Sequence, residues 1–145
     1  MEDFASQLRD GKGAERLIAM LFRNKGLKVT EAPEGWFQDW DLVIEGETME
    51  VKYDKQAHRT GNLFIETSYK GKPGGVNSTR AKWFCCVTDR NIYLMLTEEL
   101  RKFLTEPIEG ARFIDAGDNK ASTGWLIPLK EFKTVRIPTL RARER

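Results

Sequence analysis

Two carboxylates and a lysine lie close together in this sequence, within short segments of alternating apolar residues. Asp41 belongs to residues 39–44, and Glu50 and Lys52 belong to residues 48–53. Two facing carboxylates repel each other unless a cation lies between them, and Mg²⁺ is bound by one or two carboxylates together with water and phosphate oxygens. A neighbouring ammonium can orient an attacking water or stabilise charge on a reacting phosphate. The three residues therefore predict metal-assisted hydrolysis of a phosphodiester.

The register of these two segments decides whether the three side chains meet. With a two-residue turn at residues 45–46, a type that favours glycine, Asp41 lies opposite Glu50. Strand side chains alternate between faces, so Asp41, Glu50 and Lys52 share one face. The opposite face is apolar and is expected to be the core side, with Trp40, Leu42, Ile44, Met49, Val51 and Tyr53. A one-residue slip would break the pairing, and a solvated face with a charged cross-strand pair is the alternative.

Hydrophobic periodicity, glycine and proline indicate the elements that position these segments. Residues 12–25 repeat apolar side chains at helical spacing, and Gly26 ends the helix. A short strand at residues 28–32 and a turn at residues 33–35 follow. Beyond the two site segments, the pattern predicts strands at residues 62–68, 83–88 and 92–96, helices at residues 78–82 and 97–104, and short strands from Gly110 on. These elements predict an α/β domain with a central mixed sheet of four to five strands flanked by helices.

Residues 69–80 form the segment best suited to contact a nucleic-acid backbone. Their glycines allow close approach, Lys70 and Lys72 carry charge, and a helix beginning at Ser78 would aim free N–H groups outward. A flexible surface loop is the alternative. The residues predicted to contact DNA, mostly through its phosphates and independently of sequence, are Lys55, Arg59, Lys70, Lys72, Ser78, Thr79, Arg80 and Lys82.

Two other titratable residues are open to more than one interpretation. Glu66 lies among apolar residues of a predicted strand, where it either shares the face of the site or points outward. His58 is the single histidine, and a surface position in a loop is favoured over a role as general base. With one histidine and the adjacent cysteines Cys85 and Cys86, which are expected to be reduced core thiols, the chain lacks the residues for a zinc finger or a Cys–His catalytic pair.

Composition predicts one soluble domain. The 145 residues are 40% hydrophobic and 32% charged, which is typical of a globular chain long enough to bury a core. No apolar run is long enough to span a bilayer, so no membrane association is expected. The acidic N-terminus lacks the pattern of a signal peptide, and we expect a cytoplasmic or nucleoid-associated protein.

The charge of the chain is unevenly distributed although its net value is only +2. Residues 1–50 carry six basic and eleven acidic groups, whereas residues 51–90 carry eight basic and three acidic groups. Residues 130–145 add six basic and two acidic groups. An acidic segment followed by basic ones fits a metal site beside a phosphate-binding surface.

Asp41 followed by Glu50-Val51-Lys52 resembles the signature of the PD-(D/E)XK nuclease superfamily. In that signature an acidic residue on one strand precedes a Glu-x-Lys sequence on the next. Trp40 stands where the family name expects proline, at a position that contributes no ligand. The resemblance implies a core of restriction-endonuclease type.

The resemblance covers residues 11–96, follows the superfamily's αβββαβ order and includes the first helix. Glu15 matches the position at which a helix glutamate joins the metal site of archaeal Holliday-junction resolvases, although a favourable anion in the first helical turn is the alternative. Small phage-type nucleases are similar as well. Residues 1–145 are then one nuclease domain, and residues 97–145 are a C-terminal elaboration with a basic tail.

The resemblance also implies a mechanism and an assembly. Asp41, Glu50 and the Val51 carbonyl would hold Mg²⁺, for which Mn²⁺ would substitute, and Glu15 would join them directly or through water. Lys52 would position or activate water, and the product would carry a 5′-phosphate. A homodimer is implied because cutting both strands of DNA usually needs two centres.

Three substrate classes remain open for such a nuclease. Glu15 favours a resolvase of branched DNA, whereas the glycine-rich basic loop and the C-terminal part do not match the archaeal resolvases. A sequence-specific restriction or homing-type endonuclease and a nuclease of relaxed specificity are the alternatives within the class. A non-catalytic DNA-binding module is the alternative outside it, although such a module gains nothing from carboxylates that face phosphates.

Overall fold

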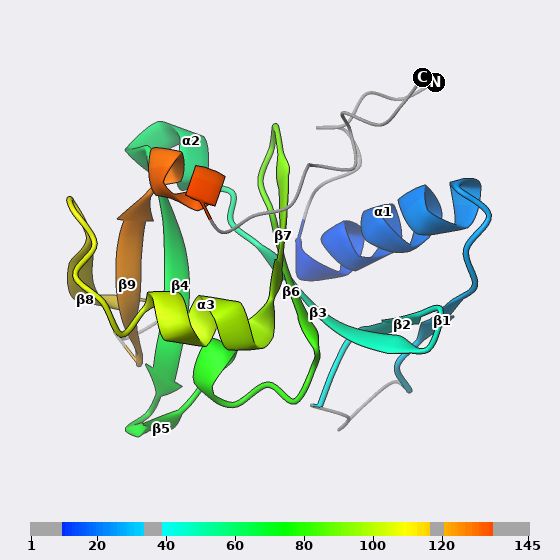
Figure 1. The fold of residues 1–145 in the computed structure, drawn as a ribbon, viewed down its shortest axis with the longest axis horizontal. Coiled ribbons are helices and arrows are strands. Elements are labelled where there is room, and N and C mark those ends of the chain that lie inside the picture. The colour runs from blue at the N-terminus through cyan, green and yellow to red at the C-terminus, as the bar shows by residue number, and fades with distance from the viewer. Residues whose placement is uncertain (1–9, 34–38, 117–120, 135–145) are drawn as a thin grey trace.

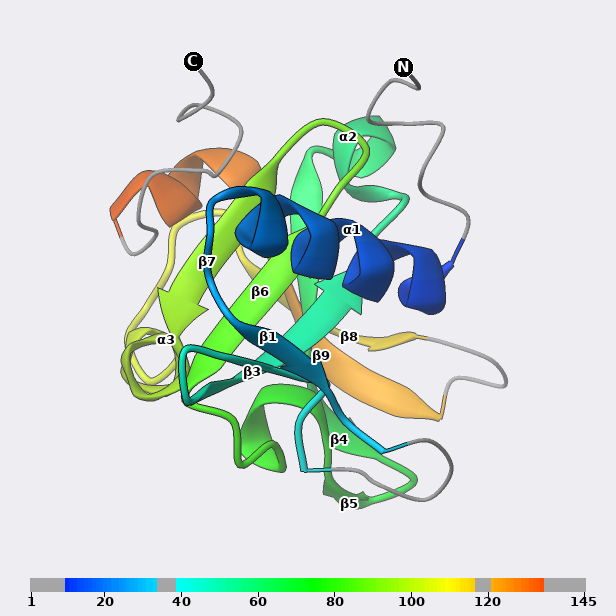
Figure 2. The ribbon, with the colours of Figure 1, turned by 90° about the vertical axis from the view of Figure 1, so that its right-hand side faces the viewer.

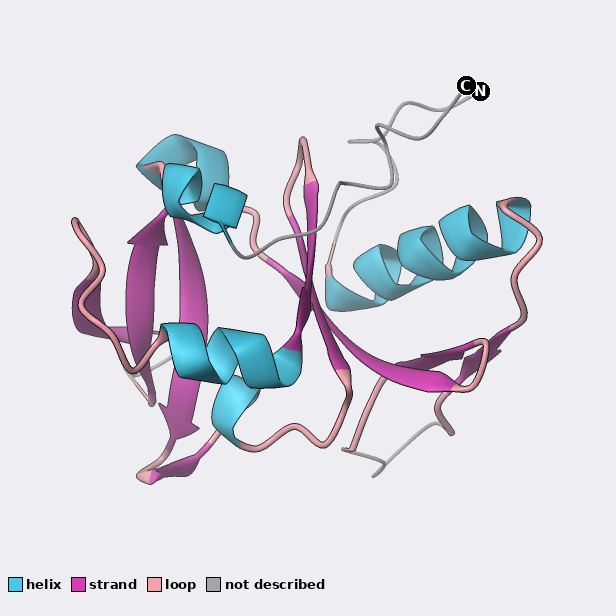
Figure 3. Cartoon of the chain, in the orientation of Figure 1, coloured by secondary structure: helices cyan, strands magenta, loops and turns pink. Residues whose placement is uncertain are grey.

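The computed structural model describes residues 10–33, 39–116 and 121–134. In these ranges the chain forms three layers (Figure 1). A helix lies against one face of a five-stranded sheet, and a four-stranded sheet lies beyond the other face, as the distribution of helices and strands in Figure 3 makes visible. The predicted mixed sheet of four to five strands is therefore present, but its two faces are covered differently.

The first sheet carries the predicted site hairpin. Its strands are β1 (Val29–Glu31), β2 (Leu42–Ile44), β3 (Glu47–Tyr53), β6 (Trp83–Val87) and β7 (Ile92–Leu96). They are ordered β1-β2-β3-β6-β7. The β3–β6 pair is parallel and the other pairs are antiparallel, so the sheet is mixed as expected.

The second sheet is antiparallel and combines strands that are far apart in the sequence. Its strands are β4 (Asn62–Tyr69), β5 (Lys72–Pro73), β8 (Arg112–Ala116) and β9 (Ser122–Pro128), in the order β5-β4-β9-β8. Short helices connect the two sheets: α2 (Ala57–Thr60), η2 (Gly75–Asn77) and α3 (Thr97–Phe103). A further short helix, η4 (Leu129–Thr134), follows β9. Residues beyond 96 thus supply two of the four strands.

Helix α1 (Gly11–Asn24) begins and ends as its sequence indicates. The Asp10 side chain accepts a hydrogen bond from the Gly13 N–H at 2.9 Å, which caps the first turn. Gly26 follows the helix with a φ of 88°, a conformation that glycine adopts without strain. Figure 2 shows α1 lying across the first sheet. Its buried apolar residues belong to one cluster with residues of β2, β3, β6 and β7.

Two hydrophobic clusters hold the layers together. The first joins α1 to the apolar face of the hairpin and includes the predicted core residues Leu42, Ile44, Met49 and Val51. The second lies between the two sheets and beside α3 and η4, with Phe84, Met95, Leu63, Ile127, Leu100 and Phe132 among its members. Burying such side chains contributes about 1.5–3 kcal/mol each, so α1 is held on one face of the first sheet and the second sheet on its other face.

Three predictions about local structure need correction. Residues 78–82 form no helix, and Ser78 instead ends the one-turn helix η2. The strand predicted at residues 39–44 covers only Leu42–Ile44. The second face of the central sheet is covered chiefly by another sheet, where flanking helices were expected.

Tertiary hydrogen bonds explain why residues 78–82 stay extended. The Arg80 N–H donates to the Asp39 carbonyl at 3.3 Å, and the Lys82 N–H donates to Thr48 Oγ1 at 2.9 Å. These bonds hold the segment in an extended path beside Asp39 and Thr48. The predicted turn at residues 33–35 and the basic tail from residue 135 lie largely or wholly outside the described residues.

Candidate functional site

The β2–β3 hairpin has the predicted register. Leu42 pairs with Met49 and Ile44 with Glu47, and the turn residues Glu45 and Gly46 have positive φ angles of 50° and 83°. Positive φ at both positions defines the type I′ turn, whose twist matches that of the strands. The one-residue slip that would have separated the carboxylates does not occur.

Asp41 lies just before this ladder and is fixed to β3 by two hydrogen bonds. Its N–H donates to the Met49 carbonyl at 2.9 Å, and its Oδ2 accepts from the Val51 N–H at 2.7 Å. Regular pairing ends at Leu42. The predicted direct pairing of Asp41 with Glu50 is therefore wrong. Its carboxylate is nevertheless held against the strand that carries Glu50 and Lys52.

Glu50 is a largely buried carboxylate with two partners. Its Oε2 pairs with Lys52 Nζ at 3.2 Å, and its Oε1 accepts from Thr79 Oγ1 at 3.1 Å. The Glu50 side chain is 12% exposed, whereas that of Lys52 is 47% exposed. The pair therefore presents its ammonium toward solvent and keeps its carboxylate beneath.

Thr79 and Arg101 brace the Glu50 carboxylate from outside the hairpin. Arg101 Nη2 donates to the Thr79 carbonyl at 2.7 Å, and its Nε donates to the Val76 carbonyl at 2.8 Å. Thr79 was predicted to contact DNA, but it is 5% exposed and its hydroxyl points at Glu50. Arg101 could not be singled out from the sequence, because nothing local connects α3 to the hairpin. Arg101 is a positioning residue, since it acts through Thr79.

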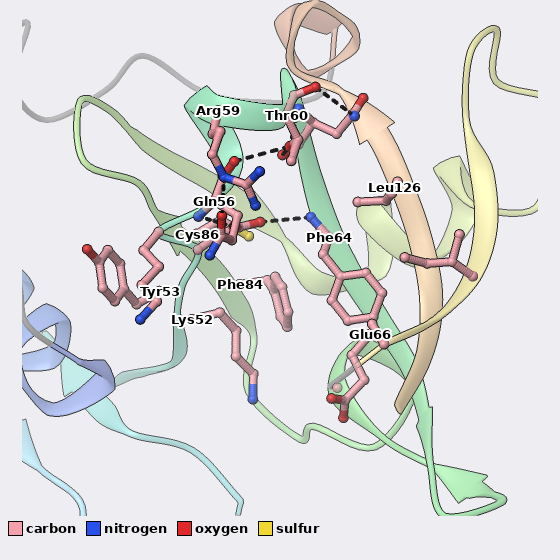
Figure 4. Close-up of a pocket in the computed structure, with 16 residues that line it drawn as sticks. Lys52, Tyr53, Gln56, Arg59, Thr60, Phe64, Glu66, Phe84, Cys86 and Leu126 are labelled. Atoms are coloured by element: carbon pink, nitrogen blue, oxygen red, sulfur yellow. Dashed lines mark hydrogen bonds between the residues drawn. The ribbon is translucent and has the colours of Figure 1, made fainter. Parts of the chain in front are cut away.

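Glu66 of β4 lies on the same side as Lys52, which settles the orientation that the sequence left open. Figure 4 shows Lys52 and Glu66 reaching the same end of a cleft from different sheets. Glu66 Oε1 accepts from Ser122 Oγ at 3.0 Å. Two glycines, Gly75 and Gly124, lie so close to the Glu66 backbone that a Cβ on either would overlap this part of β4.

The charges of this cluster are coupled. Burial raises the pKa of Glu50, and the neighbouring charge of Asp41 adds to that effect against the opposing charge of Lys52. Burial and then Asp41 raise the pKa of Glu15 as well. Burial alone would lower the pKa of Lys52, but Glu50, Glu66 and Asp41 raise it above its ordinary value. Negative charge is thus crowded here, and a cation is favoured.

The donor set fits a hard divalent cation with few protein ligands. Within the described ranges, no three histidine, cysteine or acidic side chains converge into a ready-made metal cage. Mg²⁺ typically keeps several waters and binds one or two carboxylates plus phosphate oxygens. Asp41 and Glu50 can supply the carboxylates. Glu15 interacts electrostatically with both and pairs with Lys12 at 3.5 Å.

The predicted DNA contacts are distributed around this cluster. Lys55 and Arg59 are exposed and line the cleft beside Lys52. Lys70 and Lys72 are exposed at the β4–β5 turn, as are Ser78 and Arg80 in the following segment. Lys82 is held by Glu47 at 3.1 Å. Since no helix starts at Ser78, the expected ring of helical N–H groups is absent from this described segment.

His58 contacts a residue outside the acidic cluster. Its Nε2 lies 2.8 Å from Thr88 Oγ1 at the end of β6. Burial and the charge of Arg90 lower the pKa of His58 below its ordinary value. His58 is half-buried in α2 and not in a surface loop as predicted, and it lines neither of the clefts that border Lys52.

Two adjoining clefts border the Glu50–Lys52 pair. The smaller, of about 240 Å³, is lined by Glu50, Lys52, Glu66 and Thr79 among others. The larger, of about 460 Å³, extends from Lys52 between the two sheets toward α2. The polar face of the hairpin is therefore neither an ordinary solvated face nor a packed one.

Comparison with known proteins identifies a shared fold. No protein-family model matches the chain, and no curated protein matches its sequence. Among solved structures, the chain is similar to that described as a bacterial homing endonuclease, I-Ssp6803I, with a TM-score of 0.54 and 16% sequence identity. The match covers 88% of this chain and 83% of that one. The chain thus shares the fold of that protein. None of its described helices is long and apolar enough to cross a membrane.

Proposed function

We propose that this protein is a DNA endonuclease that hydrolyses phosphodiester bonds with the help of Mg²⁺. The observation that carries the proposal is the Glu50–Lys52 pair at 3.2 Å, with Asp41 fixed beside it on a sheet of nuclease-like fold. A buried carboxylate under a half-exposed ammonium is an expensive arrangement for a surface that only binds DNA. The similarity to a homing endonuclease supports DNA as the substrate.

The chain's own residues divide the work of hydrolysis. Asp41 and Glu50 would hold Mg²⁺ together with the Val51 carbonyl, and Glu15 would join them directly or through water. When bound, the ion would lower the pKa of a water ligand and offset charge on the phosphate. Lys52, whose ammonium is favoured by its acidic neighbours, orients the attacking water or stabilises the developing negative charge. Thr79 keeps the Glu50 carboxylate in place at 3.1 Å, and the product carries a 5′-phosphate.

The substrate's shape and the number of protein copies are further parts of the proposal. Cleavage of both strands would use a homodimer, with one centre for each strand. Branched DNA is proposed as the preferred substrate because Glu15, which interacts electrostatically with Asp41, matches the helix glutamate of the archaeal Holliday-junction resolvases. A site-specific activity like that of the structurally similar homing endonuclease is the second candidate, supported by the shared fold.

A substrate panel tests the proposed reaction. The purified chain is incubated with supercoiled plasmid, linear duplex and a four-way junction, each with Mg²⁺, with Mn²⁺ or with EDTA. We expect cleavage with either metal and none with EDTA, and junction cleavage at the lowest enzyme concentration. Cleavage in EDTA would contradict the metal mechanism, and binding without cleavage under every condition would favour a non-catalytic module. Preference for one plasmid site over the junction would favour the homing-type alternative.

Glu50→Gln is expected to stabilise the metal-free protein while removing its response to Mg²⁺. Because burial raises the pKa of Glu50, its protonated form favours folding. This stabilisation is lost as pH rises through that pKa and the buried carboxylate becomes charged. A neutral glutamine avoids this cost, so in EDTA at pH 7.5 thermal unfolding should show a gain of about 1 kcal/mol. The gain should vanish near pH 4, where wild-type Glu50 is itself protonated. Mg²⁺ should raise the Tm of the wild type only.

Glu47→Gln is the matched control on the same strand. Hydrogen bonds from Trp83 and Lys82 lower the pKa of Glu47, so its ionised form favours folding above its unfolded pKa. The substitution should therefore lower the Tm at pH 7.5, the opposite sign to Glu50→Gln, and leave the Mg²⁺ response intact. Equal Tm shifts in both variants would contradict the conclusion that burial penalises the charge of Glu50 and that a cation relieves this penalty.

A further inference from the structure

The larger cleft extends well beyond the acidic cluster. It measures about 460 Å³, which lies within the range typical of small-molecule pockets. Figure 4 shows Phe84 on the Lys52 side and Phe64 and Leu126 on the β4–β9 side, so the two sheets form its opposite walls. Apolar walls that include aromatic side chains suit a planar aromatic ligand.

The cleft is continuous with the site of the proposed reaction. Lys52, Glu66 and Gly75 line both the larger cleft and the smaller one that contains Glu50. A phosphate held at Lys52 would therefore have its own nucleotide, or the next, at the entrance of the larger cleft.

Polar groups surround the apolar walls, and hydrogen bonds to Asp54 hold part of this rim in place. Arg59 and Gln56 lie at the end of the cleft opposite Lys52 and Glu66 (Figure 4), with Arg59 Nε donating to Gln56 Oε1 at 2.7 Å. Asp54 accepts from the Gln56 N–H at 3.0 Å and from the Phe64 N–H at 2.9 Å. The rim thus provides fixed hydrogen-bonding groups, and its cationic side chains are Arg59 at one end and Lys52, beside the acidic cluster, at the other.

From these observations we infer that the larger cleft receives one unpaired nucleobase of the DNA substrate, extruded from the stack beside the scissile phosphate. The inference rests on the proposed nuclease function and specifies its substrate class. An extruded base is held by stacking against aromatic or apolar side chains and by hydrogen bonds to its edge, which Phe64 and the polar rim provide. Extrusion costs least where a base is already unpaired, so bulged or branched DNA is favoured over a perfect duplex.

Binding measurements with the full chain in EDTA test this inference without depending on cleavage. Fluorescence anisotropy compares a duplex that carries one unpaired thymine with the same duplex fully paired. The bulged duplex should bind about tenfold more tightly, as expected for the stacking of one base on an aromatic side chain. Phe64→Leu should abolish most of this preference and leave the affinity for the paired duplex unchanged.

Phe113→Leu is the matched control. Phe113 lies on the other face of the same sheet, is 54% exposed and contacts Trp125 edge-on. It should keep the full preference. If Phe64→Leu proves unfolded, Ala116→Leu, which narrows the cleft from β8, takes its place with the same expected loss.

The outcomes separate the inference from the function on which it rests. Equal affinity for both duplexes, or a preference unchanged by Phe64→Leu and Ala116→Leu, overturns the base pocket even if the plasmid is cleaved. Failure to bind either duplex overturns the pocket together with DNA binding, and the cleavage panel then shows whether the nuclease proposal fails too.

Discussion

Lys52→Ala is expected to slow phosphodiester cleavage by about 10²–10³-fold and to leave DNA binding nearly unchanged. The Lys52 ammonium is half-exposed and lies 3.2 Å from the Glu50 carboxylate, where it can reach a phosphate bound in front of Asp41 and Glu50. Removing one preorganised donor from a site of developing negative charge has a cost of this size in other hydrolytic enzymes. Single-turnover cleavage of the substrate found by the panel, measured with saturating Mg²⁺, gives the rate.

Lys55→Ala separates this chemical role from simple loss of positive charge. Lys55 is exposed and lines the same cleft, but it makes no described contact with Glu50. It should weaken DNA binding modestly, with a smaller salt dependence, and leave the saturated cleavage rate within about twofold. Equal rate losses in the two variants would mean that Lys52 acts only by attracting DNA.

The hairpin of the site could be predicted because its signals are local. Alternation of apolar residues sets the two faces, and Gly46 sets the turn, so the pairs Leu42–Met49 and Ile44–Glu47 follow from a few neighbouring residues. The same reasoning failed one step further along the strand. Asp41 leaves the ladder because its side chain captures the Val51 N–H at 2.7 Å, a competition that alternation alone does not describe.

The support of the site could not be predicted because it depends on contacts between distant segments. Residues 78–82 have a locally plausible helix start, yet bonds to Asp39 and Thr48 hold them extended. The extension brings Thr79 against Glu50, and Arg101 of α3 completes the brace. Each of these bonds joins elements whose proximity exists only after folding, and local propensity is overridden where such bonds accumulate.

The second sheet illustrates the same limit in the backbone. Strand β9 pairs with β4 across more than fifty residues, with Gly124 opposite Glu66 next to an irregularity between Glu66 and Ser68. The residues after Gly110 indicate short strands, but nothing local indicates which strands they pair with. A glycine inside a strand often marks a bulge or a close approach of another backbone, and Gly124 is the signal that could have pointed to this contact.

Gly124→Ala is accordingly expected to destabilise the protein by about 3 kcal/mol, which corresponds to a fall in Tm of roughly 10 °C. A Cβ at this position would overlap the Ile65 carbonyl oxygen and lie 2.8 Å from the Glu66 Cα. Both obstacles are backbone atoms in the middle of the β4–β9 ladder, so neither can rotate away as a flexible side chain would. Relief would require the two strands to separate or Glu66 to shift. Thermal unfolding in EDTA measures the loss.

Gly11→Ala is the control that makes this prediction specific. Gly11 begins α1, and a Cβ there would meet nothing within 4 Å. Since alanine is the better helix former, by up to about 1 kcal/mol, the control should be neutral or slightly stabilising. A Tm for Gly124→Ala that matches the wild type would mean that β4 and β9 do not approach as closely as described.

Glu66 faces Lys52 from β4, the strand that the Gly124→Ala substitution would displace. This variant should therefore also lose the preference for bulged DNA, which ties the second sheet to substrate choice as well as to stability.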